Sequence, residues 1–365
     1  MLSSAVEYLE KEKNKTETQR IIAFDAMRII AIFAVIWLHY SSQRYYTSFP
    51  STEWEIRNIY DSMVRWGVPV FVMISGALFL DSNKKISIKR LYKKNILRIL
   101  CALIFWSSIY AVYDIFFISR QGTTLGGVIS CVVKGPFHLW FLKMLLGLYI
   151  MAPILKVIAN NKKLEVYFLL LALITTFALP WGFKLLSFLN NNISTLFNEF
   201  YSKMDIKIAW GYCGYFMLGH YLRNNPFNSS IRKTIYFLGL ISWICVIVFT
   251  HFRSIHANQA DVFFYNNLSL FTLAEAIAVF TLIHHKFSNF NSKYSPIIIK
   301  ISNLTFGVYL IHILLRNFIR DSFGIDTYTW GVGVGVPVLS IITFTISLFF
   351  AWTINKIPYA SRFII

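Results

Sequence analysis

Ten runs of about 20 mostly apolar residues follow one another along this 365-residue chain. A run of that length crosses the roughly 30 Å hydrocarbon core of a bilayer as an α-helix, whose backbone hydrogen bonds are all internal. Only 14% of the residues are charged, whereas soluble domains carry about 25%. The sequence therefore predicts an all-α integral membrane protein with about ten transmembrane helices, at residues 20–43, 60–80, 95–118, 138–159, 165–186, 208–223, 233–251, 263–285, 296–319 and 333–355.

The distribution of positive charge predicts the orientation, because Lys and Arg concentrate on the cytoplasmic side. Most of the 35 Lys and Arg residues lie in segments that share the side of the N-terminus. We therefore expect both termini in the cytoplasm, with residues 1–19 as a polar lead, 20–355 as one transmembrane domain and 356–365 as a short tail. The net charge of +18 is spread over these segments, so no nucleic-acid partner is expected. The four cysteines lack metal-ligand spacing, and no metal is expected.

Two ionisable residues interrupt the first apolar run, FDAMRIIAIFAVIWLHY, at Arg28 and His39. A charge inside a membrane helix costs roughly 2.5 kcal/mol or more, so each of these residues needs an explanation. Eleven helical positions give a rise of roughly 16 Å and three turns plus about 20°. Arg28 and His39 therefore project from nearly the same face at different depths, and this face is expected to line a passage or cavity.

Other ionisable residues fall within later predicted helices. Glu275 lies near the middle of its helix, where a carboxylate needs a partner such as Arg28 or a water-filled cavity. His312 and Arg316 are four residues apart, and Tyr309 precedes His312 by three, so the three share one side of a helix. Simpler roles are open for each of them: Arg316 could extend to lipid headgroups, and His312 could bond a neighbouring helix.

The candidates for substrate binding are Glu275, Tyr309 and Arg316, together with His138, Trp140 and Ser75. His138 and Trp140 open the fourth predicted helix in PFHLWFLKMLLGLY, and Ser75 precedes a glycine in the second. His138 and Trp140 could equally anchor the protein at the membrane interface, and Ser75 could bond a neighbouring backbone.

A basic run, KKISIKRLYKKNILR, follows the second predicted helix on the expected cytoplasmic side. It could simply fix the topology or bind anionic lipid. It could also form a docking surface for a phosphate-bearing donor, with Lys89, Arg90, Lys94 and Arg98 as the candidate contacts.

Taken together, these segments resemble the acyltransferase-3 family of bacterial membrane acyltransferases. Arg28, ten intervening residues and His39 look like the family's first-helix signature. Three further segments are similar to family segments in the same order along the chain: VPVFVMISGALFL with the basic run after it, FHLWFLKMLLGLYIMAPIL and SNLTFGVYLIHILL.

The resemblance implies transfer of an acyl group, usually acetyl from cytoplasmic acetyl-CoA, to a hydroxyl of a surface polysaccharide or lipid-linked glycan. It implies a location in the bacterial cytoplasmic membrane, in contact with lipid, with acetyl-CoA as a co-substrate and no permanently bound cofactor. Arg28 and His39 match the family's paired residues, and His312 matches its late histidine. The chain resembles the single-domain branch, as in members that acetylate enterobacterial common antigen.

The residue chemistry and the resemblance suggest one mechanism. His39 is the candidate general base, because a neutral imidazole can take a hydroxyl proton near neutral pH. Arg28 is expected to hold the donor, since its guanidinium stays protonated. Direct transfer and an acyl-His39 intermediate both remain open. A multi-span transporter of a glycan precursor or metabolite is the alternative, although the sequence has no internal repeat of the kind many carriers have.

Overall fold

The computed structural model describes residues 21–82, 87–115, 117, 125–189, 191–203, 211–287, 290, 293–358 and 363–365. Within these residues the protein is helical, with no strand. Nine helices are long and apolar enough to cross a membrane in this part of the chain. This finding confirms the prediction of an all-α membrane protein. The lead at 1–19 and the lysines at 84 and 85 lie outside the described residues.

The helices run in this order: α2 (Ile22–Ser41), α3 (Thr52–Ser62), α4 (Gly67–Phe79), α5 (Ile88–Arg90), η1 (Leu91–Ile96), α6 (Leu97–Asp114), α7 (Leu125–Lys134), η3 (Phe137–Leu139), α8 (Trp140–Ala159), α9 (Lys162–Ala172), η4 (Leu173–Ala178), α10 (Leu179–Leu189), α11 (Asn191–Lys203), α12 (Tyr212–Asn224), α13 (Ser229–Ala257), η5 (Phe263–Tyr265), α14 (Leu270–Phe287), α15 (Ser295–Phe323) and α16 (Val332–Asn355). Here η1 and η4 are π-helical turns, and η3 and η5 are 3₁₀ turns.

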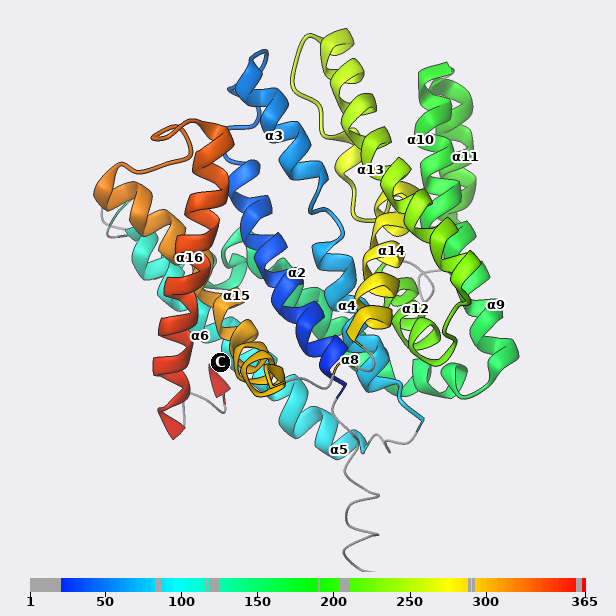
Figure 1. The fold of residues 1–365 in the computed structure, drawn as a ribbon, viewed down its shortest axis with the longest axis horizontal. Helices are drawn as coiled ribbons and strands as arrows, with labels where there is room; N and C mark the ends of the chain where they lie inside the picture. The colour runs from blue at the N-terminus through cyan, green and yellow to red at the C-terminus, as the bar shows by residue number, and fades with distance from the viewer. Residues whose placement is uncertain are drawn as a thin grey trace, which may run out of the picture.

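Helix α2 lies at the centre of the bundle, against α3, α4, α14, α15 and α16 (Figure 1). Its first half adds Phe24 and Met27 to a hydrophobic core shared with α4, α8, α12 and α14. Its second half adds Ile32 and Ile36 to another core, shared with α6, α8, α15 and α16. Helix α2 therefore contributes side chains to both hydrophobic cores and connects the helices that form them.

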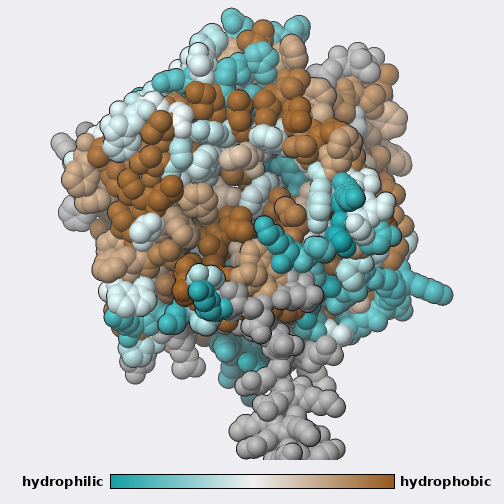
Figure 2. Space-filling view, in the orientation of Figure 1, coloured by the Kyte–Doolittle hydropathy of each residue, from teal (hydrophilic) through white to brown (hydrophobic). Residues whose placement is uncertain are grey.

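Both ends of the membrane domain lie at the same end of the bundle. Figure 1 shows α2 beginning and α16 ending at the lower end, where α5 also lies, and α3 at the opposite end. Figure 2 shows broad apolar areas on this face, with hydrophilic side chains at its upper and lower ends and in a group to the right of its centre. This distribution is typical of a protein surrounded by lipid. Which end faces the cytoplasm remains a prediction.

The sixth predicted span, 208–223, corresponds to a helix too short to cross the bilayer. Helix α12 has 13 residues and is about 20 Å long; residues 204–210 before it lie outside the described part. It packs closely on α4, because a Cβ on Gly76 would overlap the carbonyl oxygen of Phe216, and one on Gly219 that of Met73. Its apolar residues are therefore buried against protein, which explains why its hydropathy resembles that of a spanning helix.

This backbone contact predicts the outcome of a conservative substitution. Gly76→Ala is expected to lower the free energy of unfolding by about 1–3 kcal/mol or more, because the added methyl forces α4 away from α12. Thermal unfolding of the purified protein in detergent measures this loss. Gly147→Ala in α8 is the control, since a Cβ there meets nothing within 4 Å. Equal stability of the two variants would contradict the close packing.

Candidate active site

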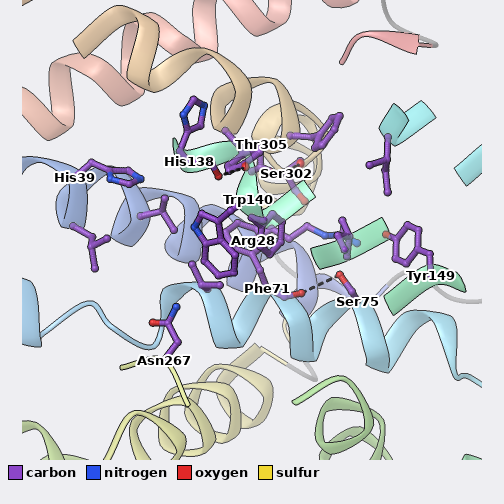
Figure 3. Close-up of a pocket in the computed structure, with 18 of the residues that line it drawn as sticks. Arg28, His39, Phe71, Ser75, His138, Trp140, Tyr149, Asn267, Ser302 and Thr305 are labelled. Carbon is purple, nitrogen blue, oxygen red and sulfur yellow. Dashed lines mark hydrogen bonds between the residues drawn. The ribbon is translucent and has the colours of Figure 1, made fainter. Parts of the chain in front are cut away.

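A cavity of about 490 Å³ lies between α2, α4, α8 and α15. Arg28 and His39 both line it, from the face of α2 that carries them (Figure 3). The volume lies within the roughly 300–1,000 Å³ of ligand sites. The eleven-residue spacing thus gives one continuous cavity a guanidinium near one end and an imidazole near the other, which we call the Arg28 end and the His39 end.

Arg28 is held in place by a carboxylate on its own helix. Its Nη1 lies 3.2 Å from Oδ1 of Asp25, which is 1% exposed, and the hydroxyl of Ser302 donates to the same oxygen at 2.7 Å. The ion pair offsets the cost of a guanidinium at this depth, and Ser302 ties it to α15. Asp25 was not among the site residues predicted from the sequence. Its spacing of three residues from Arg28 is nevertheless typical of two side chains that meet on one helix face.

The Arg28 end of the cavity is formed partly by the π-helical turn η1. Asn95 from this turn and Arg98 from the start of α6 line the cavity, together with Tyr149 and Ser75. The Arg98 guanidinium lies over the ring of Phe306 and donates a hydrogen bond to the carbonyl oxygen of Ile365. Single π-helical turns often mark functional sites, because they change which side chains face inward.

The other three basic candidates lie outside this lining. Lys89, Arg90 and Lys94 are exposed on the same segment, and no carboxylate pairs with them among the described residues. They leave an excess of positive charge near the Arg28 end.

Three histidines converge at the His39 end, each from a different part of the chain. The ring centroids of His39 and His312 lie 5.3 Å apart, and those of His312 and His138 lie 5.4 Å apart. His39 and His138 line the cavity, whereas His312 contacts both from outside the lining. Their spacing in the sequence gives no indication of this cluster; helix packing creates it.

The hydrogen-bonding state of His312 follows from its geometry. Nδ1 lies 2.6 Å from the carbonyl oxygen of Tyr309, which can only accept, so Nδ1 carries a hydrogen. In the neutral ring, Nε2 then carries the lone pair, and it has no hydrogen-bond partner among the described residues. His312 therefore presents an acceptor beside His39.

His138 is the most unusual of the three. It is 2% exposed, and neither ring nitrogen has a hydrogen-bond partner in the described part of the chain. Its backbone carbonyl accepts a hydrogen bond from the hydroxyl of Tyr309 at 2.7 Å, and its ring lies 5.0 Å from that of Tyr110. Since buried polar groups are nearly always hydrogen-bonded, a ligand in the cavity would complete this site.

Two further sequence candidates, Arg316 and Glu275, lie outside the cavity lining. Arg316 donates to the carbonyl oxygen of His39 at 3.1 Å and to Oδ1 of Asn317 at 3.1 Å, so it joins α15 to the end of α2. Glu275 is 4% exposed, and neither carboxylate oxygen has a hydrogen-bond partner among the described residues. The carboxylate beside Arg28 is Asp25, so the suggested pairing of Arg28 with Glu275 is not seen.

The remaining candidates line the cavity. Ser75 donates to the carbonyl oxygen of Phe71 at 3.0 Å, and Trp140 and Tyr309 contribute aromatic surface. Asn267 also lines the cavity; it lies in a loop without a recognisable motif, so the sequence contains no signal for it.

One protein-family model matches nearly the whole of the chain. The family model described as an acyltransferase domain, Acyl_transf_3, matches residues 21–355. No curated protein and no solved structure matches the chain significantly. The chain belongs to the acyltransferase-3 family and is a multi-pass membrane O-acyltransferase.

The contact between Arg28 and Asp25 predicts a loss of stability. Asp25→Asn keeps an acceptor for Ser302 but removes the charge beside Arg28, and is expected to cost about 1–3 kcal/mol of unfolding free energy. Denaturation in detergent measures the change. Asp321→Asn, which removes the partner of the more exposed Arg320, is the control and should cost less than about 1 kcal/mol. A smaller loss for Asp25→Asn than for the control would contradict this account.

Proposed function

We propose that this protein transfers an acetyl group from cytoplasmic acetyl-CoA to a hydroxyl of a cell-surface polysaccharide or lipid-linked glycan, in the bacterial cytoplasmic membrane. The observation that carries the proposal is the single cavity lined by both Arg28 and His39. Such a cavity allows a donor from one side of the membrane and an acceptor from the other to meet.

The charge at the Arg28 end supports a phosphate-bearing donor there. Arg28 and Arg98 line the cavity, and Lys89, Arg90 and Lys94 are exposed on the adjoining segment. Clustered cations attract anions and raise their local concentration. In this proposal the phosphates of CoA lie near these residues, and its flexible arm extends past Arg28 toward His39, over roughly 16 Å.

The reacting groups meet at the His39 end. A base takes the proton of the acceptor hydroxyl, the oxygen bonds to the thioester carbonyl carbon, and the carbon–sulfur bond breaks. The departing CoA sulfur then receives the proton. His39 is the proposed base because its imidazole lines the cavity, and the lone pair of His312 Nε2 beside it can orient or relay a proton.

The negative charge that forms on the carbonyl oxygen needs a hydrogen-bond donor. His138 is suited to this role, since it is one of the residues that line the cavity and both of its ring nitrogens are free of protein partners among the described residues. The same groups would serve an acyl-His39 intermediate, in which the imidazole attacks first and the hydroxyl second.

The proposal predicts different consequences for its two main residues. Acetyl-CoA at 100 times its dissociation constant should stabilise the wild type by about 2.7 kcal/mol, which thermal unfolding in detergent detects. Arg28→Ala should lose this stabilisation, whereas His39→Ala should retain it but transfer no acetyl group.

Arg320→Ala, outside the cavity lining, is the control and should behave as wild type. If the wild type gains no stability from acetyl-CoA and instead accumulates a substrate in sealed vesicles without thioester, a transporter is the better description.

The tautomer of His312 predicts which substitution preserves activity. Glutamine can place an oxygen near the position of Nε2, whereas asparagine can replace only the Nδ1–H that donates to Tyr309. His312→Asn is therefore expected to lower the transfer rate about 100-fold or more, and His312→Gln considerably less. Rates of CoA release under saturating donor give the comparison. The opposite ranking would show that the Tyr309 contact, rather than the lone pair, is what matters.

A further inference from the structure

A second cavity of about 300 Å³ adjoins the His39 end of the first. Arg65 lines both cavities, and Ser42 in the second follows His39 by only three residues. The turn after α2, the end of α3 and the η5 loop form its walls, through Ser42, Tyr45, Tyr46, Asp61, Arg65, Val262, Tyr265 and Asn266. The shared residue places the second cavity beside the end of the first at which His39 lies.

The charges of the second cavity balance each other. Asp61 is fully buried and ion-paired with Arg65, whose guanidinium lies 4.1 Å from the centroid of the Tyr265 ring and donates to the Tyr265 carbonyl oxygen at 3.2 Å. Nearby, Arg253 pairs with Asp261 at 2.8 Å. The second cavity therefore differs from the Arg28 end, where several exposed cations have no carboxylate partner among the described residues. A phosphate or carboxylate gains little here, and an uncharged ligand fits better.

The rings of Tyr45 and Tyr265 give the cavity a rigid aromatic wall. Their hydroxyls bond each other at 3.2 Å, and that of Tyr265 donates to Oδ1 of Asn58 at 2.6 Å. Behind them, Trp54 and Phe264 belong to the same buried cluster. Because these hydroxyls are already engaged, the wall offers ring surface more than hydrogen bonds.

Polar groups at the rim complete the cavity. Oδ1 of Asn266 accepts the backbone N–H of Leu268 at 2.9 Å, so the amide is oriented and the two Nδ2 hydrogens have no partner among the described residues. The side chain of Tyr46 is 64% exposed, and Ser42 adds a hydroxyl. Fixed donors beside aromatic surface suit a compact ligand that has both apolar C–H faces and hydroxyl groups.

We propose that the second cavity binds an uncharged sugar ring of the acceptor, next to the ring whose hydroxyl is acylated at His39. The inference rests on the proposed function and narrows its acceptor to a neutral saccharide of at least two rings. Tyr46 and Asn266 are then specificity-determining residues, which contact the second ring but make no contact with the reacting atoms. The volume, at the lower limit for small-ligand sites, suits one ring.

The test measures acetyl transfer to defined sugars by the full-length protein, purified in a detergent without a sugar headgroup. The probes are methyl hexopyranosides, the corresponding methyl 1,4-linked disaccharides, and hexuronides as anionic counterparts. Tyr46→Ala and Asn266→Ala should each raise KM for the disaccharide at least fivefold, with kcat and the KM for acetyl-CoA unchanged. KM for the monosaccharide should not change. Tyr167→Ala, with the same 64% exposure on α9, is the matched control and should behave as wild type.

Three results would overturn the inference while the proposed function stands. They are an unchanged disaccharide KM in both variants, a preference for hexuronides over neutral sugars, and no acetylation of any neutral probe by a protein that still consumes acetyl-CoA with a membrane extract as acceptor. Failure of the wild type to bind or consume acetyl-CoA at all would instead overturn the proposed function, and this inference with it.

Discussion

The arrangement of this protein depends on how a guanidinium is accommodated at membrane depth. Arg28 is stabilised by the buried carboxylate of Asp25, which in turn accepts a hydrogen bond from Ser302 on α15. A second contact, from Arg316 to the carbonyl oxygen of His39, joins the same two helices near the other end of α2. With α2 fixed at both ends, the face that carries Arg28 and His39 is held toward the cavity.

The two ends of the cavity differ in charge, and this difference bears on which substrate binds where. Near the Arg28 end, Lys89, Arg90 and Lys94 are exposed and pair with no carboxylate in the part of the chain that the structure describes. At the second cavity, Arg65 is paired with Asp61, and Arg44 nearby is paired with Asp326 at 2.9 Å, whereas Arg316 bonds to the carbonyl oxygen of His39 and to Asn317. A charged donor and an uncharged acceptor would thus each find a matching environment, without any need for either to cross the membrane.

The histidine cluster illustrates chemistry that exists only in three dimensions. His39, His138 and His312 lie far apart along the chain. Taken alone, a histidine in a membrane helix can simply anchor the helix at the interface or bond to a neighbouring helix. Their ring contacts, and the carbonyl of Tyr309 that fixes the hydrogen on His312, make them one group. Together they place the acceptor Nε2 of His312 directly beside His39 in the buried interior.

The sequence by itself determined the class of protein and the face of α2. A succession of long apolar runs indicates a bundle of membrane-spanning helices, and the helical repeat puts Arg28 and His39 on one side of the first of them. Only the tertiary structure decided their surroundings: Ser302 bonded to Asp25, Asn267 in the lining, Arg316 and Glu275 outside it, and α12 as a short helix buried against α4. The spacing of residues along one helix fixes the relative directions of their side chains, because the helical backbone is regular. Contacts between helices depend on how whole faces pack, and no local pattern encodes that.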